Sequence, residues 1–191
     1  MVFVRFSDCN LRCSIANSGF DCDTEFTSGT KCNAQDILES IKDAYTSGNI
    51  SPNRKPYWIL LTGGEPALQV DDELIVALRE EGYKISVETN GTIPLPSGID
   101  WVCVSPKTAI HTIRQRPCHE VKIVRSYGHN LDHLEDELEA KFDQSVMLWV
   151  SPAAEADLSI SSTNLRWCIS LVKRYPRWRL SVQQHKLFGI R

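Results

Sequence analysis

The stretch that decides the fold is Tyr57-Trp-Ile-Leu-Leu61, followed at once by Thr62-Gly63-Gly64-Glu65-Pro66. Five apolar residues in a row are typical of a strand that is buried on both faces, as in a parallel sheet. The polar, glycine-containing segment comes where this strand ends, which is where α/β proteins place their functional sites. An apolar pattern at helical spacing around Leu74 and Leu78 follows and ends at Gly82. The segment therefore predicts one β/α unit with a site at the carboxyl end of its strand.

The rest of the sequence repeats this alternation of short apolar runs and helical patterns. Asn33 is expected to cap the first helix. Together the elements predict an α/β fold, a partial (β/α) barrel of about six or seven units, which is fewer than the eight units of a full barrel. We expect a single domain over residues 1–191. The predicted strands cover residues 2–6, 57–61, 84–88, 101–104, 121–124, 146–150 and 178–182, and the main predicted helices cover 34–45, 131–142 and 163–175.

The composition, 42% hydrophobic and 24% charged, is that of an ordinary globular protein. The net charge of -3 lacks the basic excess of nucleic-acid binders. No apolar run approaches the roughly 20 residues of a membrane helix, and the N-terminal residues lack the layout of a signal peptide. We therefore expect a cytoplasmic protein that binds neither nucleic acid nor membrane.

Cysteines are clustered near the N-terminus. Four of the seven, Cys9, Cys13, Cys22 and Cys32, fall within the first 32 residues. In a reducing compartment such clusters indicate metal binding or catalysis. Three thiolates on one polar loop, Cys9, Cys13 and Cys22, can hold an iron–sulfur cluster and leave one iron open to an exogenous ligand. The alternative is a structural zinc site with Cys32 as the fourth ligand, although the paired C-x2-C spacings common in such sites are absent.

Several polar residues at predicted strand ends have both a functional and a structural interpretation. Glu65 can pair with an ammonium group, or it can belong to a glycine turn that starts a helix at Pro66. Glu88 and Asn90 can hold ribose hydroxyls, or Asn90 can form an ordinary Asn-Gly turn. Lys107 can bind a carboxylate, although a single lysine is usually a solvated surface charge.

Three further residues are open to similar alternatives, and Cys103 has a single interpretation. Thr24 can ligate a cation through its hydroxyl or simply cap the backbone. Arg5 can meet an anionic substrate or lie along the surface. His185 follows a predicted strand and can bond a substrate or pack without a function. Cys103 is expected to pack in the core of its strand.

The segment Cys9-Asn-Leu-Arg-Cys13, with Cys22-Asp-Thr24 after it, resembles the cluster loop of radical S-adenosylmethionine (SAM) proteins. The compact form of that loop is C-x3-C-x2-C, whereas the second gap here has eight residues. A variable loop that ends in Cys-Asp-Thr is similar to that of the 7-carboxy-7-deazaguanine synthases. The motifs that follow resemble those of the same family in the same order: Thr62-Gly63-Gly64-Glu65-Pro66, Glu88-Thr89-Asn90-Gly91-Thr92, Ser105-Pro106-Lys107, His119-Glu120-Val121-Lys122 and Gln183-Gln184-His185-Lys186.

The resemblance implies a barrel of the radical SAM type and a role for each matching residue. The implied ligands of a [4Fe–4S] cluster are Cys9, Cys13 and Cys22, and the implied ligand of Mg²⁺ is Thr24. The implied SAM-binding residues are Gly63, Gly64, Glu65, Glu88, Asn90, Ser105, Pro106 and Lys107. The implied substrate-binding residues are Arg5, Thr62, Lys122, Gln183 and His185.

The resemblance also implies the reaction. A reduced cluster cleaves SAM, and the resulting radical abstracts hydrogen from C6 of 6-carboxy-5,6,7,8-tetrahydropterin. Ring contraction with loss of ammonia then gives 7-carboxy-7-deazaguanine, which feeds 7-deazapurine pathways such as queuosine synthesis. The implied partners are this small-molecule pterin, an electron donor such as flavodoxin or ferredoxin, and a second copy of the chain in a homodimer.

The match has two departures. In the family a first strand and a Gln-Gly-Glu-Gly-like loop that contacts the substrate precede the segment matching Phe3-Val4-Arg5, and this sequence begins after them. An aromatic residue usually precedes the last cluster cysteine, whereas Asp21 stands there and Phe20 one position earlier. We therefore expect substrate binding and SAM stacking to differ from the family pattern. The alternatives are a radical SAM activase and a degenerate, non-catalytic metal-binding relative.

Overall fold

The computed structural model describes residues 1–14, 22, 24–46, 55–155 and 159–184. Seven strands form one sheet in the order β1 to β7, and each strand pair with an assigned register runs parallel. The chain forms two compact units. Unit 1 comprises Met1–Asn10, Thr24–Thr89 and Ile93–Cys103, and unit 2 comprises Leu11–Asp23, Asn90–Thr92 and Val104–Arg191.

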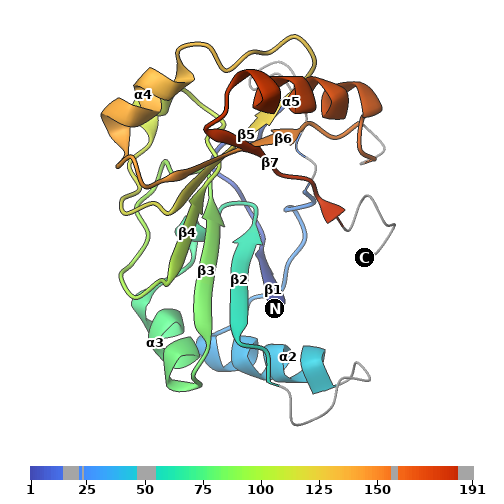
Figure 1. The fold of residues 1–191 in the computed structure, drawn as a ribbon. Helices are drawn as coiled ribbons and strands as arrows, with labels where there is room; N and C mark the ends of the chain where they lie inside the picture. The colour runs from blue at the N-terminus through green and yellow to red at the C-terminus, as the bar shows by residue number, and fades with distance from the viewer. Residues whose placement is uncertain (15–21, 23, 47–54, 156–158, 185–191) are drawn as a thin grey trace. The chain divides into compact units, whose positions relative to one another are not determined.

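Unit 1 contains the first strands of the sheet and two helices that pack on them (Figure 1). Helix α2 packs against α3 and β1, and α3 packs against β3. Alternate residues of the strands, such as Ile59 and Leu61, are buried with Leu78 of α3, because successive side chains of a strand point to opposite faces. The elements are β1 (Val2–Phe6), α2 (Ala34–Thr46), β2 (Trp58–Gly63), the 3₁₀ helix η1 (Pro66–Leu68), α3 (Asp72–Glu80), β3 (Lys84–Thr89) and β4 (Trp101–Val104), whose last residue is counted in unit 2.

The first helix of unit 1 begins as the sequence predicts. The side-chain oxygen of Asn33 accepts a hydrogen bond from the backbone N–H of Asp36 (2.9 Å), and the Asp36 carboxylate accepts one from the Asn33 N–H (2.9 Å). This reciprocal pair satisfies two backbone donors that the helix itself leaves without acceptors. The predicted cap at Asn33 is therefore confirmed.

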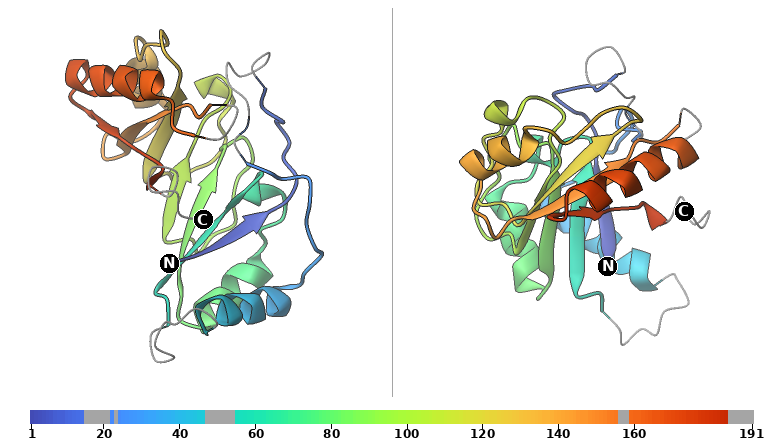
Figure 2. Two further views of the ribbon diagram at one scale, coloured as in Figure 1. Left: turned by 90° about the vertical axis from the view of Figure 1, so that its right-hand side faces the viewer. Right: turned by 45° about the horizontal axis from the view of Figure 1, so that its top comes forward.

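Unit 2 contains the last three strands and two α-helices. Helix α5 lies along β6 and β7 and buries Cys168 and Leu171 (Figure 2). The buried strand residues Val121, Leu148 and Val150 form the core on the same alternating pattern. The elements are η2 (Ile110–Thr112), β5 (Glu120–Arg125), α4 (Leu134–Lys141), β6 (Met147–Pro152), α5 (Ser162–Arg174) and β7 (Trp178–Leu180).

The α/β fold with a parallel sheet is confirmed, and the differences lie at element ends. Helix α4 begins at Leu134 instead of residue 131, because His133 has a φ of +65°, which a right-handed helix does not accept. Strand β2 continues to Gly63, because Thr62 and Gly63 still pair with β1. Residues 90–100, all of them described, join β3 to β4 without a helix. No helix among the described residues combines the length and apolar character needed to cross a membrane.

The buried face of α3 gives a test of the core. Leu78 is 0% exposed, so Leu78→Ala is expected to lower the free energy of unfolding by about 2–5 kcal/mol, measured by urea denaturation. The control is Val76→Ala on the same helix. Val76 is 52% exposed, so this change is expected to stay within about 0.5 kcal/mol. Equal losses at both positions would contradict the assigned buried face.

Candidate active site

The two glycines after β2 allow one backbone to lie directly against another. A Cβ on Gly63, whose φ is +122°, would lie 2.3 Å from the carbonyl oxygen of Phe6, and a Cβ on Gly64 would lie 1.8 Å from that of Asp8. The N–H groups of Gly64 and Glu65 donate to these same oxygens, at 2.8 and 2.9 Å. The turn after β2 therefore holds the segment that leads from β1 into the cysteine loop.

The cysteine loop starts with strained backbone. Asp8 and Arg12, which each stand one residue before a cysteine, have φ values of +68° and +47°, a left-handed conformation that non-glycine residues rarely adopt. The Asp8 carboxylate accepts a hydrogen bond from the Cys9 N–H (2.8 Å). In unit 2 the Cys22 N–H donates to the carbonyl oxygen of Cys13 (3.3 Å). The structure therefore brings Cys13 and Cys22 together across the loop.

Exposure and pKa together separate the candidate ligands from the other thiols. Cys9 and Cys13 are half-buried and Cys22 is exposed. Burial instead raises the pKa of Cys118 to about 12 and that of Cys168 to about 11. Because the thiolate is the metal ligand, Cys9, Cys13 and Cys22 suit a cluster, whereas the buried Cys168 and the half-buried Cys118, whose thiols have raised pKa values, do not. Within the described ranges no group of three His, Cys, Asp or Glu side chains already surrounds a metal position, so the fit rests on donor chemistry and accessibility.

Glu65 is fully enclosed at the start of η1. Its Oε1 accepts hydrogen bonds from the backbone N–H of Ala67 (3.0 Å) and from the hydroxyl of Thr89 (2.5 Å). Pro66 occupies the first position of η1, where a missing N–H costs nothing. The structure thus shows the turn-and-cap arrangement that was the alternative for Glu65. Its pairing with an ammonium group stays a prediction.

The Asn90-Gly91 segment after β3 is a tight turn. The side-chain oxygen of Asn90 accepts hydrogen bonds from the N–H (2.9 Å) and the hydroxyl (2.7 Å) of Thr92. Gly91 has a φ of +79°, and its carbonyl oxygen accepts from the N–H groups of Arg114 (2.8 Å) and Gln115 (3.0 Å). The turn interpretation of Asn90 is therefore confirmed, and its contact with ribose stays a prediction.

The Ser105-Pro106-Lys107 motif is joined to β5. The hydroxyl of Ser105 donates to the carbonyl oxygen of Lys122 (3.0 Å). Lys107 folds back so that its ammonium group donates to the carbonyl (3.1 Å) and hydroxyl (2.5 Å) oxygens of Ser105. Pro106 is buried. This motif therefore lies beside Lys122, one of the residues that the resemblance assigns to the substrate.

The remaining predicted residues are placed as follows. Arg5 and Thr62 are register partners on β1 and β2, with Arg5 exposed and Thr62 half-buried. Thr24 and Gln183 are half-buried. Glu88 is half-buried in β3. His185 lies outside the described residues.

One residue of this region was missed in the sequence. Thr89 donates a hydrogen bond from its hydroxyl to Glu65, whereas the sequence pattern had indicated its neighbours Glu88 and Asn90. The alternation of β3 gives a signal, because Thr89 falls on the same side as the buried Val87. The choice of Glu65 as its partner depends on strand pairing, which no local pattern reveals.

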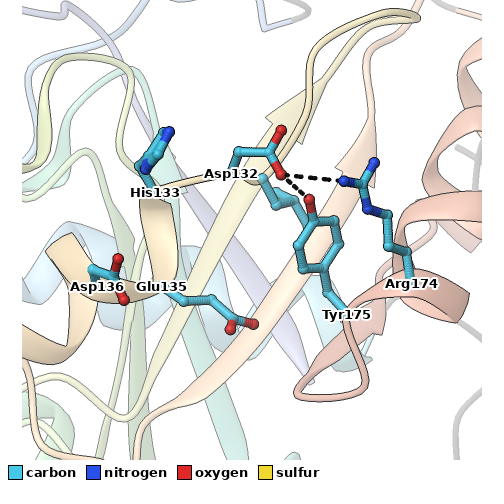
Figure 3. Close-up of a pocket in the computed structure, with 7 residues that line it drawn as sticks. Asp132, His133, Glu135, Asp136, Arg174 and Tyr175 are labelled. Carbon is cyan, nitrogen blue, oxygen red and sulfur yellow. Dashed lines mark hydrogen bonds and ion pairs between the residues drawn. The ribbon is translucent and has the colours of Figure 1, made fainter.

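A shallow pocket at the start of α4 contains none of the predicted site residues. Figure 3 shows the Asp132 carboxylate between the Tyr175 hydroxyl, which donates to it, and the Arg174 guanidinium, 3.7 Å away. Its lining residues are Leu131, Asp132, His133, Glu135, Asp136, Arg174 and Tyr175. Asp132 is already paired with Arg174 and Tyr175 within the pocket. We therefore interpret this pocket as a structural feature and not as the candidate site.

The steric role of Gly64 can be tested by adding one methyl group. Gly64→Ala places a Cβ on the Asp8 carbonyl, so we expect a loss of roughly 1–3 kcal/mol in unfolding free energy and a lower iron content after anaerobic reconstitution. The control is Gly82→Ala. Gly82 has a φ of +77° but open space around it, so its substitution strains the backbone without touching the loop. Unchanged iron content in Gly64→Ala would show that the turn does not hold the cysteine loop.

The thiol pKa values predict which cysteines react. At pH 8 a thiol with a pKa of about 12 is ionised in about one molecule in ten thousand, so Cys118 is expected to resist iodoacetamide in the native protein. The exposed Cys22 is expected to be alkylated under the same conditions, and mass spectrometry of peptides identifies both. Alkylation of Cys118 as fast as that of Cys22 would contradict the raised pKa of Cys118. Both should react after denaturation.

Comparison with known proteins begins with the fold. No family model matches the sequence. The structure is similar to the crystal structure of QueE from Escherichia coli, with a TM-score of 0.67 and 22% sequence identity, over 95% of this chain and 84% of that one. At this identity the likeness supports the fold alone, and it agrees with the predicted partial (β/α) barrel of about six or seven units.

Sequence comparison identifies nearer relatives, all named 7-carboxy-7-deazaguanine synthase. The protein of Bradyrhizobium diazoefficiens is 39% identical, over 100% of this chain and 89% of its own length. That of Bacteroides thetaiotaomicron is 37% identical, over 100% and 87%, and that of Caulobacter vibrioides is 32% identical, over 99% and 89%. Identity at this level over nearly whole chains, together with the shared fold, shows that the chain belongs to the 7-carboxy-7-deazaguanine synthase family.

Proposed function

We propose that this chain is a radical SAM enzyme that converts 6-carboxy-5,6,7,8-tetrahydropterin to 7-carboxy-7-deazaguanine with loss of ammonia, in 7-deazapurine biosynthesis of the queuosine type. The observation that carries the proposal is the family membership, with 39% identity along the whole chain to a synthase named for this product. The accessible thiols of Cys9, Cys13 and Cys22 support it, because they suit a [4Fe–4S] cluster. The chain then acts as a single radical SAM domain.

The cluster and SAM, when bound, supply the one-electron chemistry that starts the reaction. Cys9, Cys13 and Cys22 hold the cluster as thiolates. The Gly63-Gly64-Glu65 turn, proposed to bind SAM, also holds the chain before Cys9 through two backbone hydrogen bonds. The turn can therefore fix the position of Cys9 relative to the proposed SAM-binding residues, and such positioning is the main contribution of a protein to cofactor chemistry.

The other motifs are assigned to SAM, to Mg²⁺ and to the substrate. Glu88 and Asn90 bind the ribose of SAM, Lys107 binds its carboxylate, and Ser105 and Pro106 also contact SAM. The Ser105 hydrogen bond to the Lys122 backbone joins this motif to the strand that carries a substrate residue. Thr24 contributes a hydroxyl to Mg²⁺, a hard cation that prefers oxygen ligands. The residues that bind the substrate are Arg5, Thr62, Lys122, Gln183 and His185. Flavodoxin or ferredoxin donates the electron, and the enzyme is a homodimer.

The test is product formation by the reconstituted protein. The chain is loaded anaerobically with iron and sulfide, then given dithionite, SAM, Mg²⁺ and 6-carboxytetrahydropterin, and the product is sought by mass spectrometry. Cys9→Ala, Cys13→Ala and Cys22→Ala are each expected to abolish product, because each removes a cluster ligand. Cys32→Ala, at another exposed cysteine, is the matched control and is expected to remain active.

The same experiment distinguishes the zinc alternative. A zinc site with four protein ligands would lose its metal in Cys32→Ala and would not cleave SAM. Bound zinc and no SAM cleavage in the wild-type protein would overturn the proposed function. SAM cleavage without this product would indicate another radical SAM substrate.

A further inference from the structure

Three side chains form a row across β5, β6 and β7 within unit 2. Lys122 is the register partner of Trp149, and Trp149 is the register partner of Arg179. Register partners on parallel strands point to the same face of a sheet, so the three side chains share one face. That face is opposite the one that carries the buried Leu148 and Val150.

Arg179 is exposed and has no acidic partner among the described residues. The central carbon of its guanidinium lies 5.6 Å from the centre of the Trp149 ring. Its hydrogen bond runs from Nη1 to the Sδ of Met147 (3.3 Å), and a thioether is a weak acceptor. By contrast Arg177, two residues earlier, forms an ion pair with Glu139. Arg179 thus has donors available for an anionic or carbonyl ligand.

Trp149 contacts Arg179 through the face of its ring, and not through its indole N–H. The indole nitrogen of Trp149 is buried and has no hydrogen-bond partner within the described part of the chain. Such a buried donor costs about 1–3 kcal/mol, so hydrogen bonding does not explain a tryptophan at this position. A guanidinium over an aromatic face within about 6 Å of its centre is attracted to the ring by a cation–π interaction that leaves its N–H donors available to a ligand. The ring therefore orients Arg179.

We propose that Arg179 binds an oxygen of the pterin substrate and that Trp149 is the positioning residue that orients its guanidinium. The inference rests on the proposed function, because it takes a carboxylated pterin as the ligand. Pterins carry a ring carbonyl, and this substrate adds a carboxylate, so both acceptors suit the planar donors of arginine. Lys122, already proposed to bind substrate, stands in the same row and adds positive charge.

The test measures binding without turnover. The reconstituted chain with SAM is titrated with 6-carboxypterin, the oxidised and unreactive analogue, by calorimetry. Arg179→Gln is expected to weaken binding about tenfold, the usual loss for a hydrogen bond to a charged group. Trp149→Leu should also weaken it, whereas Trp149→Phe keeps an aromatic face and should stay within about twofold of the wild type. Arg177→Gln, whose ion pair lies elsewhere, is the matched control and should bind normally.

Thermal unfolding midpoints show that each variant is folded, and Arg179→Lys gives a second variant that keeps the charge but loses the planar donors. Wild-type affinity in Arg179→Gln would overturn the role of Arg179, and equal weakening in Trp149→Phe and Trp149→Leu would overturn the positioning role of Trp149. If the wild type forms 7-carboxy-7-deazaguanine while Arg179→Gln binds the analogue normally, this inference alone fails. If the wild type neither binds the analogue nor forms the product, both the proposed function and this inference fail.

Discussion

The contact between the Gly63-Gly64-Glu65 turn and the backbone that follows β1 is the constraint on which the rest of the candidate site depends. The carbonyl oxygens of Phe6 and Asp8 accept the N–H groups of Gly64 and Glu65 at 2.8 and 2.9 Å, so the chain enters the cysteine loop along a path that β2 defines. Any side chain at position 64 would collide with this path. The first proposed cluster ligand, Cys9, and the proposed SAM-binding turn are therefore two ends of one backbone arrangement.

A buried carboxylate extends this arrangement to the next strand. Glu65 is 0% exposed, and a charged group at such a position is tolerated only when hydrogen bonds replace its hydration. It accepts one from the start of η1 and one from Thr89 at the end of β3. Three strand ends of unit 1 are thus joined near one position. This explains how irregular segments, which lack the regular backbone hydrogen bonds of a sheet, can hold functional groups at fixed places.

The strands and the cap at Asn33 could be predicted from the sequence, because hydrophobic runs and capping residues are local signals. Contacts between side chains could not be predicted where they depend on which strands pair and in which register. Thr89 with Glu65, and Trp149 with Arg179, belong to this class. The glycine pair was correctly located, but its expected partner was a ligand, whereas the structure shows the chain's own backbone at that distance. Local pattern therefore indicated the candidate site residues, and long-range pairing determined the contacts that the structure shows for them.

The seven cysteines show how a fold selects the ligands of a reactive centre. Cys103 and Cys168 are buried, and burial raises the pKa of Cys118 to about 12, so these thiols are poor sources of thiolate. Cys22 and Cys32 are the two exposed cysteines, and Cys32 is the one that lies outside the three proposed ligands. A structural zinc would use it to close a four-coordinate site, whereas a cluster with three protein ligands leaves one iron open. In the proposed enzyme SAM binds at this open iron, so the proposed chemistry requires both that Cys32 stay out of the site and that the other three cysteines enter it.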